Sequence, residues 1–313
     1  MPDRTTLSTE VAVELAHALV ADVAARSECR VLFIKGPVAV EQRLRPERSS
    51  TDADVWVDPR RQTTLIDALA RHGWRRRPLP DGPRILESHS VTLLHHNWPC
   101  DIDVHRYFPG LLAGDSELFD LLWDRRQDVV IAGRPVPACD RLASSLVLAA
   151  HQLRDFTSVR NRSEYEWLVD ELRGTLSDRD RTELRQLARD TGTTDSLRRF
   201  LLDIEIAPPQ GPTTGEYERQ LREWRMRASS NTPTSRWLFT IRRARWVERP
   251  RVMWRALFLP GDLLDQLHPE VGDNAVDRAR ARITRLGRGA RALAPSLATA
   301  IRTRRDHEVT REH

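Results

Sequence analysis

The sequence predicts an α+β domain followed by an all-helical domain. Short strands and helices alternate along the first part of the chain, whereas helical stretches follow one another in the second part with no strand between them. The pattern changes close to Asp140, so we expect one domain at residues 1–138 and another at residues 139–313, which ends in a basic helix. A length of 313 residues has room for two domains of ordinary size.

Apolar periodicity and turn residues locate the elements of the first domain. A helical stripe that includes Val11, Leu15 and Val23 predicts a helix over residues 8–26. The wholly apolar run Val31–Ile34 predicts a strand that is buried on both faces. We expect further helices at residues 38–44, 63–72 and 117–124, and further strands at 53–57, 90–96, 101–107, 129–131 and around 136.

The second domain is expected to contain only helices. They are predicted at residues 141–154, 164–173, 178–190, 194–206, 216–228, 237–245 and 276–305. Proline and glycine predict a linker at residues 208–212 and a second break at residues 260–261.

Composition and charge limit the class of protein. The chain has 50 basic and 45 acidic residues and a formal net charge of +5, which favours anionic partners without identifying one. No apolar run reaches the roughly 18 residues that a membrane helix needs, so we expect no membrane span. The 3 cysteines are widely spaced and odd in number, which fits neither a disulfide framework nor a zinc site. We therefore expect a cytoplasmic protein.

Two pairs of aspartates carry the strongest chemical signal. Asp52 and Asp54 begin one predicted strand, and Asp101 and Asp103 begin another. Residues two apart in a strand point to the same face, so each pair projects from one side of the sheet. Clustered carboxylates repel one another unless a cation lies between them. Oxygen ligands of this kind suit Mg²⁺ or Mn²⁺.

A turn that suits phosphate lies upstream of the first pair. Lys35, which is the only lysine in the chain, and Gly36 follow a predicted strand and precede a predicted helix. Backbone N–H groups at such a turn bind phosphate, although Pro37 removes one of these donors. Arg48, Ser49 and Ser50 offer further donors to a triphosphate.

Together these motifs resemble a known group of enzymes, the nucleotidyltransferases of the DNA polymerase β-type superfamily. The resemblance is closest to an uncharacterised bacterial branch of that superfamily. The segments that carry it are Ile34-Lys35-Gly36, Arg48-Ser49-Ser50-Thr51-Asp52-Ala53-Asp54-Val55 and Ile102-Asp103-Val104-His105. It extends over about residues 30–270, thinning toward the end. The superfamily has Gly or Ser after the glycine of the turn, and this chain has Pro37 instead.

The resemblance implies an α/β-type nucleotidyltransferase core with a mixed sheet. It also implies roles for individual residues. Asp52, Asp54 and Asp103 would hold Mg²⁺ or Mn²⁺ and carry catalysis, with Asp101 as the alternative third carboxylate and His105 as an accessory group. Lys35, Gly36, Arg48 and Ser50 would bind the nucleotide.

The function that follows is a metal-dependent nucleotidyltransferase. It would transfer NMP from an NTP to a hydroxyl or similar acceptor and release pyrophosphate. The sequence leaves the acceptor open between a small molecule, a tRNA and a protein. The alternative is a nucleotidyltransferase fold whose chemistry has decayed and that serves as a nucleic-acid-binding module or scaffold.

An Arg/Trp-rich stretch at residues 236–255 bears on that alternative. Interleaved arginines and tryptophans can bind nucleic acid through phosphate contacts and stacking, or form a helix that lies at a membrane interface. We favour the simpler interpretation, a helix whose tryptophans point inward and whose arginines are solvated.

Overall fold

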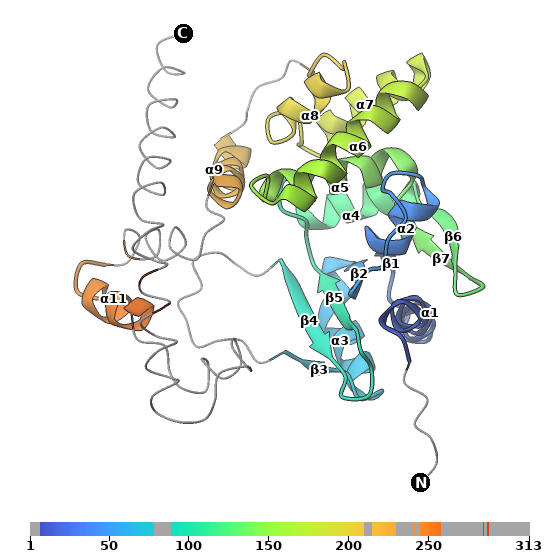
Figure 1. Ribbon diagram of the computed structural model, residues 1–313, viewed down its shortest axis with the longest axis vertical. Helices are drawn as coiled ribbons and strands as arrows, with labels where there is room; N and C mark the ends of the chain where they lie inside the picture. Colours follow the sequence, from blue (N-terminus) through green and yellow to red (C-terminus); the bar gives the residue numbers. More distant parts are fainter. Residues whose placement is uncertain are drawn as a thin grey trace. The chain divides into compact units, whose positions relative to one another are not determined.

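The computed structural model describes residues 7–77, 89–209, 215–229, 241, 245–257, 284 and 287. The chain divides into two compact units, one made of residues 1–77 and 88–225 and the other of residues 78–87 and 226–313. The sheet and helices α1 to α8 belong to the first unit, and helix α11 (Arg249–Leu257) belongs to the second (Figure 1).

A seven-stranded sheet forms the centre of the first unit, with the strand order β3-β4-β5-β2-β1-β7-β6. Its strands are β1 (Val31–Phe33), β2 (Asp52–Val57), β3 (Arg75–Arg76), β4 (Ser90–Leu94), β5 (Asp101–His105), β6 (Gln127–Ile131) and β7 (Arg134–Ala138). Strands β2 and β5 are parallel, as are β1 and β7, and the other neighbours are antiparallel. The mixed sheet is therefore confirmed.

The helices agree closely with the apolar periodicity. They are α1 (Thr9–Arg26), α2 (Gly36–Glu41), α3 (Gln62–Ala70), α4 (Asp115–Asp124), α5 (Arg141–Arg154), α6 (Val159–Thr175), α7 (Asp178–Asp190), α8 (Arg198–Asp203) and α9 (Gly215–Ser229), with a 3₁₀ turn η1 (Pro59–Arg61). Helix α6 begins earlier than expected because Ser158 caps it, accepting a hydrogen bond from the Asn161 N–H. Strand β3 was not predicted, since its two exposed arginines carry no apolar pattern.

Helices α1 and α3 cover one face of the sheet and build the main core. Ala16 and Val20 of α1 and Leu65 of α3 pack with Ala53 and Val55 of β2 in one cluster of buried side chains. Because strand side chains alternate, the residues between them project from the opposite face. That opposite face of β2 carries the aspartates described below.

The described residues after β7 form helices and no strand, as expected. Residues 142–150 of α5 are all buried, and α5 packs against both α6 and α7 (Figure 1). The predicted break at residues 260–261 lies outside the described residues. So do the predicted helices at 237–245 and 276–305, apart from residues 241, 245, 284 and 287.

The inward orientation expected for the tryptophans of the Arg/Trp-rich stretch is wrong for two of them. Trp246 is 80% exposed and Trp254 is 63% exposed. An aromatic side chain is buried only where a neighbouring element supplies apolar surface, which the periodicity of a single helix does not reveal. Among the helices that the structure describes, none has the length and apolar character needed to cross a bilayer.

Candidate active site

The two aspartate pairs lie side by side at the beginning of two parallel strands. Strands β2 and β5 pair in a register that places Asp52 next to Asp101 and Asp54 next to Asp103. Neighbours in register share a face of the sheet, so all four carboxylates belong to one surface. The parallel pairing brings together segments that are about fifty residues apart in the sequence.

Lys35 reaches this surface from the end of strand β1. Because β1 and β2 are antiparallel, the end of β1 lies beside the beginning of β2, and the Ile34 N–H donates to the Asp54 carbonyl at 3.2 Å. The backbone of Lys35 has φ 58°, a left-handed conformation that costs a residue with a side chain about 1 kcal/mol or more. This conformation accompanies a direct ion pair, in which Lys35 Nζ lies 2.5 Å from Asp54 Oδ1.

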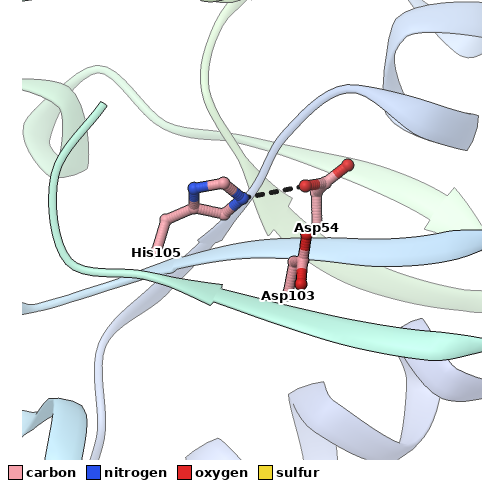
Figure 2. A group of neighbouring side chains, drawn as sticks. All are labelled: Asp54, Asp103 and His105. Carbon is pink, nitrogen blue, oxygen red and sulfur yellow. Dashed lines mark hydrogen bonds and ion pairs between the residues drawn. The ribbon is translucent and has the colours of Figure 1, made fainter. Parts of the chain in front are cut away.

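Asp54 is a buried carboxylate held by two donors. Besides Lys35 Nζ, His105 Nε2 lies 2.8 Å from the same oxygen, Oδ1 (Figure 2). Burial by itself disfavours the charged carboxylate, but the charge of Lys35 and the hydrogen bond from His105 outweigh it and hold the pKa of Asp54 below its ordinary value. Asp54 is therefore ionised at neutral pH although only 5% of the residue is exposed.

Asp103 completes a group that could hold a metal ion. Asp54, Asp103 and His105 each offer one ligand atom, and these atoms lie within 4.8 Å of one another. Figure 2 shows the two carboxylates on their neighbouring strands with the imidazole beside them. Thr92 Oγ1 of strand β4 donates to Asp103 Oδ1 at 2.5 Å. Two carboxylates and an imidazole form a mixed oxygen and nitrogen donor set of the kind that binds divalent cations.

Asp52 and Asp101 flank this group without belonging to it. Burial, followed by the charge of Asp54, raises the pKa of Asp52 to about 6. Asp101 is bound instead by Arg77, whose Nη2 lies 2.6 Å from Asp101 Oδ2. Burial raises the pKa of Asp101 while Arg77 opposes that shift. The two candidates for the third carboxylate thus differ: the register places Asp103 beside Asp54, whereas Asp101 lies beside Asp52 and is bound by Arg77.

The expected nucleotide-binding residues fall into two groups. Gly36 and Ser50 adjoin each other, since a Cβ on Gly36 would lie 3.3 Å from Ser50 Oγ, and Gly36 has φ 43°. Arg45 Nη2 donates to Ser50 Oγ at 3.2 Å. Arg48 is turned toward helix α6, where its Nε lies 3.1 Å from Glu164 Oε1. Lys35, Gly36 and Ser50 are thus brought together, whereas Arg48 is held by an ion pair.

Two residues from later in the chain close around Lys35 and His105. The Phe108 ring lies 5.7 Å from Lys35 Nζ and 5.6 Å from the His105 ring centre. His151 of α5 lies within electrostatic range of Lys35, Asp54 and His105, and its Nδ1 is buried without a hydrogen-bond partner among the described residues. Burial lowers the pKa of His151 well below its ordinary value, and the charge of Lys35 adds to that shift. The helical half of the unit therefore approaches the carboxylates.

The sequence interpretation missed Thr92 and Phe108. Thr92 belongs to a strand that was predicted, but its pairing with Asp103 depends on the antiparallel register of β4 and β5. Phe108 follows β5 by three residues, in a stretch with no motif. The available signal was the presence of a threonine on a predicted strand close to the aspartate strand, which does not by itself specify a partner.

Residues 7–203 match the family model described as uncharacterised nucleotidyltransferase. This match covers more than half of the chain, and the chain therefore belongs to this family. The protein is a nucleotidyltransferase, as the aspartate motifs predicted. No curated protein sequence matches the chain.

Several solved structures are similar to the chain at low identity. The lincosamide antibiotic adenylyltransferase LnuA, with lincomycin bound, is 16% identical and has a TM-score of 0.35, over 50% of this chain and 94% of that one. The antibiotic-resistance factor ANT(2'')-Ia is 13% identical with a TM-score of 0.37, over 62% and 99%. An antigenic nucleotidyltransferase-like protein from Paracoccidioides brasiliensis is 11% identical with a TM-score of 0.38, over 64% and 96%.

Proposed function

We propose that this nucleotidyltransferase uses a divalent cation to transfer NMP from an NTP to an acceptor hydroxyl, with release of pyrophosphate. The observation that carries the proposal is the convergence of Asp54, Asp103 and His105 within 4.8 Å on two parallel strands. The residues fit the cation, because the carboxylate oxygens of Asp54 and Asp103 suit Mg²⁺ and Mn²⁺. A bound cation would neutralise charge on the triphosphate and make the acceptor hydroxyl more acidic.

The carboxylates have distinct parts in this proposal. Asp54 is kept ionised by Lys35 and His105 and so is ready to ligate. Asp103 lies beside it and is the residue we assign to the acceptor side, where it orients the hydroxyl and favours loss of its proton. Asp52 lies on the same face, where burial and, after it, the charge of Asp54 raise its pKa to about 6, and a bound cation would favour its ionised form. We assign Asp52 to the triphosphate side.

Lys35, Gly36 and Ser50 are proposed to bind the triphosphate. The ammonium of Lys35 lies next to the carboxylates, and Gly36 leaves room for a phosphate to approach the backbone. Pro37 lacks an N–H, so we assign most of the phosphate contact to side chains. Arg48 would join them only by leaving Glu164, from which it is 3.1 Å in this structure.

The transfer itself is a displacement at the α-phosphorus. The acceptor oxygen forms a bond to phosphorus, the bond to the bridging oxygen of the β-phosphate breaks, and the hydroxyl proton passes to the Asp103 carboxylate or to water. Lys35 is positioned to offset the charge that develops on the pyrophosphate. His151 brings helix α5 to this site, which supports a role for the helical half in forming the acceptor side. An NTP is an intracellular metabolite, so we also propose a cytoplasmic protein.

Nucleotide binding by two matched variants tests the proposal. The thermal shift that each of the four NTPs produces is measured with Mg²⁺, with Mn²⁺ and without metal, for the wild type, Asp103→Asn and Asp101→Asn. The two variants remove the same charge from the same strand and the same face of the sheet. We expect a metal-dependent shift in the wild type and in Asp101→Asn that is lost in Asp103→Asn. An equal response of the two variants would refute the assignment of Asp103.

A further inference from the structure

The carboxylates of Asp54 and Asp103 are both contacted at Oδ1. In Asp54, Lys35 and His105 both contact Oδ1, and in Asp103 the Thr92 hydroxyl contacts Oδ1. The shortest Lys35–Asp54 contact and the hydrogen bonds of His105 and Thr92 all fall on Oδ1 of these aspartates. The hydrogen bonds to each carboxylate therefore fall on one of its two oxygens.

Strand β4 supplies the donor for Asp103 through its register. Strands β4 and β5 are antiparallel, and Thr92 is the residue directly opposite Asp103. Side chains at such paired positions share a face and lie about 5 Å apart, which is the reach of a hydroxyl to a carboxylate. Threonine is branched at Cβ and has few rotamers in a strand, so its hydroxyl is held in place by the backbone. The observed distance of 2.5 Å is that of a hydrogen bond to a charged acceptor.

The neighbouring carboxylate, Asp101, is held by a different kind of donor. Asp101, two residues before Asp103 on the same face, is bound by the half-exposed Arg77 through Oδ2. Asp103 is bound by a short, uncharged side chain that orients the carboxylate and adds no positive charge next to it. A neutral donor leaves the full negative charge of Asp103 for a cation, whereas an arginine would compete with the cation.

We propose that Thr92 is a positioning residue for the metal site. By holding Oδ1 of Asp103, its hydroxyl fixes the orientation of that carboxylate beside Asp54, and so presets the Asp103 ligand before a divalent cation arrives. The inference rests on the proposed function, because it assumes that Asp54 and Asp103 ligate the cation. Groups that orient a ligand in this way commonly account for a factor of about 10 to 100 in metal affinity.

Two substitutions at position 92 test the inference with a readout that does not depend on turnover. Thr92→Val keeps the shape of the side chain and removes the hydroxyl, and Thr92→Ser keeps the hydroxyl. The affinity of each full-length variant for Mn²⁺ is measured by the loss of the free-ion signal in electron paramagnetic resonance, without nucleotide. We expect Thr92→Val to weaken Mn²⁺ binding about tenfold or more and Thr92→Ser to bind nearly as the wild type does.

Two controls separate the possible failures. Thermal unfolding of each variant reports whether the fold is retained, and Asp103→Asn reports what loss of the ligand itself does. Mn²⁺ binding that is unchanged in Thr92→Val but lost in Asp103→Asn would overturn the role of Thr92 and leave the proposed function intact. Absence of Mn²⁺ binding in the wild type, or wild-type binding in Asp103→Asn, would overturn both. Equal weakening in Thr92→Val and Thr92→Ser would also overturn the role of the hydroxyl.

Discussion

The ion pair between Lys35 and Asp54 makes a strong prediction about stability. The side chains are only 11% and 6% exposed, so neither charge is well solvated when the other is removed. Lys35→Met leaves a buried carboxylate with His105 as its remaining partner, and Asp54→Asn leaves a buried ammonium. Breaking a buried pair from one side typically costs about 3–5 kcal/mol, whereas replacing both partners is close to neutral. We expect each single variant to lose about 3 kcal/mol or more.

The double variant measures how much of that cost is shared. If the two groups were independent, Lys35→Met/Asp54→Asn would lose the sum of the single effects, about 6 kcal/mol or more. Because the removal of the second charge relieves the first defect, we expect the double variant to be at least as stable as either single variant. Urea unfolding at neutral pH, followed by tryptophan fluorescence, gives the three free energies. Additive single effects, or single effects below about 1 kcal/mol, would refute the argument from burial.

The single variant Lys35→Met also makes a prediction about cation binding. Lys35 places a positive charge 2.5 Å from Asp54, which opposes the approach of a second cation. Lys35→Met should therefore bind Mn²⁺ more tightly than the wild type when nucleotide is absent. When the anionic triphosphate is present the sign should reverse, because Lys35 then contacts phosphate. Unchanged Mn²⁺ affinity in Lys35→Met would show that the ammonium and the metal do not share this carboxylate.

Three further predictions concern parts of the fold outside the candidate site. Burial alone would raise the pKa of Asp58, but hydrogen bonds from Arg60 and Arg30 outweigh it and lower that pKa to about 2, so Asp58 stabilises the fold above its unfolded pKa of about 4. The stability difference between the wild type and Asp58→Asn should therefore shrink as the pH falls from about 4 toward about 2, and a difference that is constant over this range would contradict the ion pairs. Gly192→Ala should destabilise the chain by about 1–3 kcal/mol in urea unfolding, because Gly192 has φ 69° and a Cβ there would lie 2.9 Å from the backbone nitrogen of Ala113; an unchanged midpoint would argue against this contact. All 3 cysteines are free and buried, so a thiol reagent should react with them only after unfolding, and rapid reaction in the native protein would exclude this packing.

Much of the architecture could be predicted because its signals are local. Helix α5 has the predicted bounds, since its apolar residues recur at helical spacing and Asp140 provides an N-cap. The run at β1 is buried as expected, and each Asp-x-Asp pair begins a strand. Strand β3 was missed because pairing with β4, and not composition, makes two exposed arginines into a strand. The tryptophans at 246 and 254 were misplaced because burial depends on neighbours that a single helix does not specify.

Some features of the candidate site could likewise be predicted from the local sequence, whereas others depend on contacts between distant segments. The alternation of side chains in a strand gives the face on which Asp52, Asp54, Asp101 and Asp103 lie, and this needs no knowledge of the partner strand. The choice of Asp103 as the neighbour of Asp54 depends on the register between β2 and β5, since a shift of two residues would place Asp101 beside Asp54 instead. The hydrogen bonds that orient these carboxylates come from β4, β1 and the end of β5, so they exist only once the sheet has assembled. A sequence motif therefore identifies the acidic residues of such a site, whereas the residues that orient their carboxylates can be identified only from the register of the sheet.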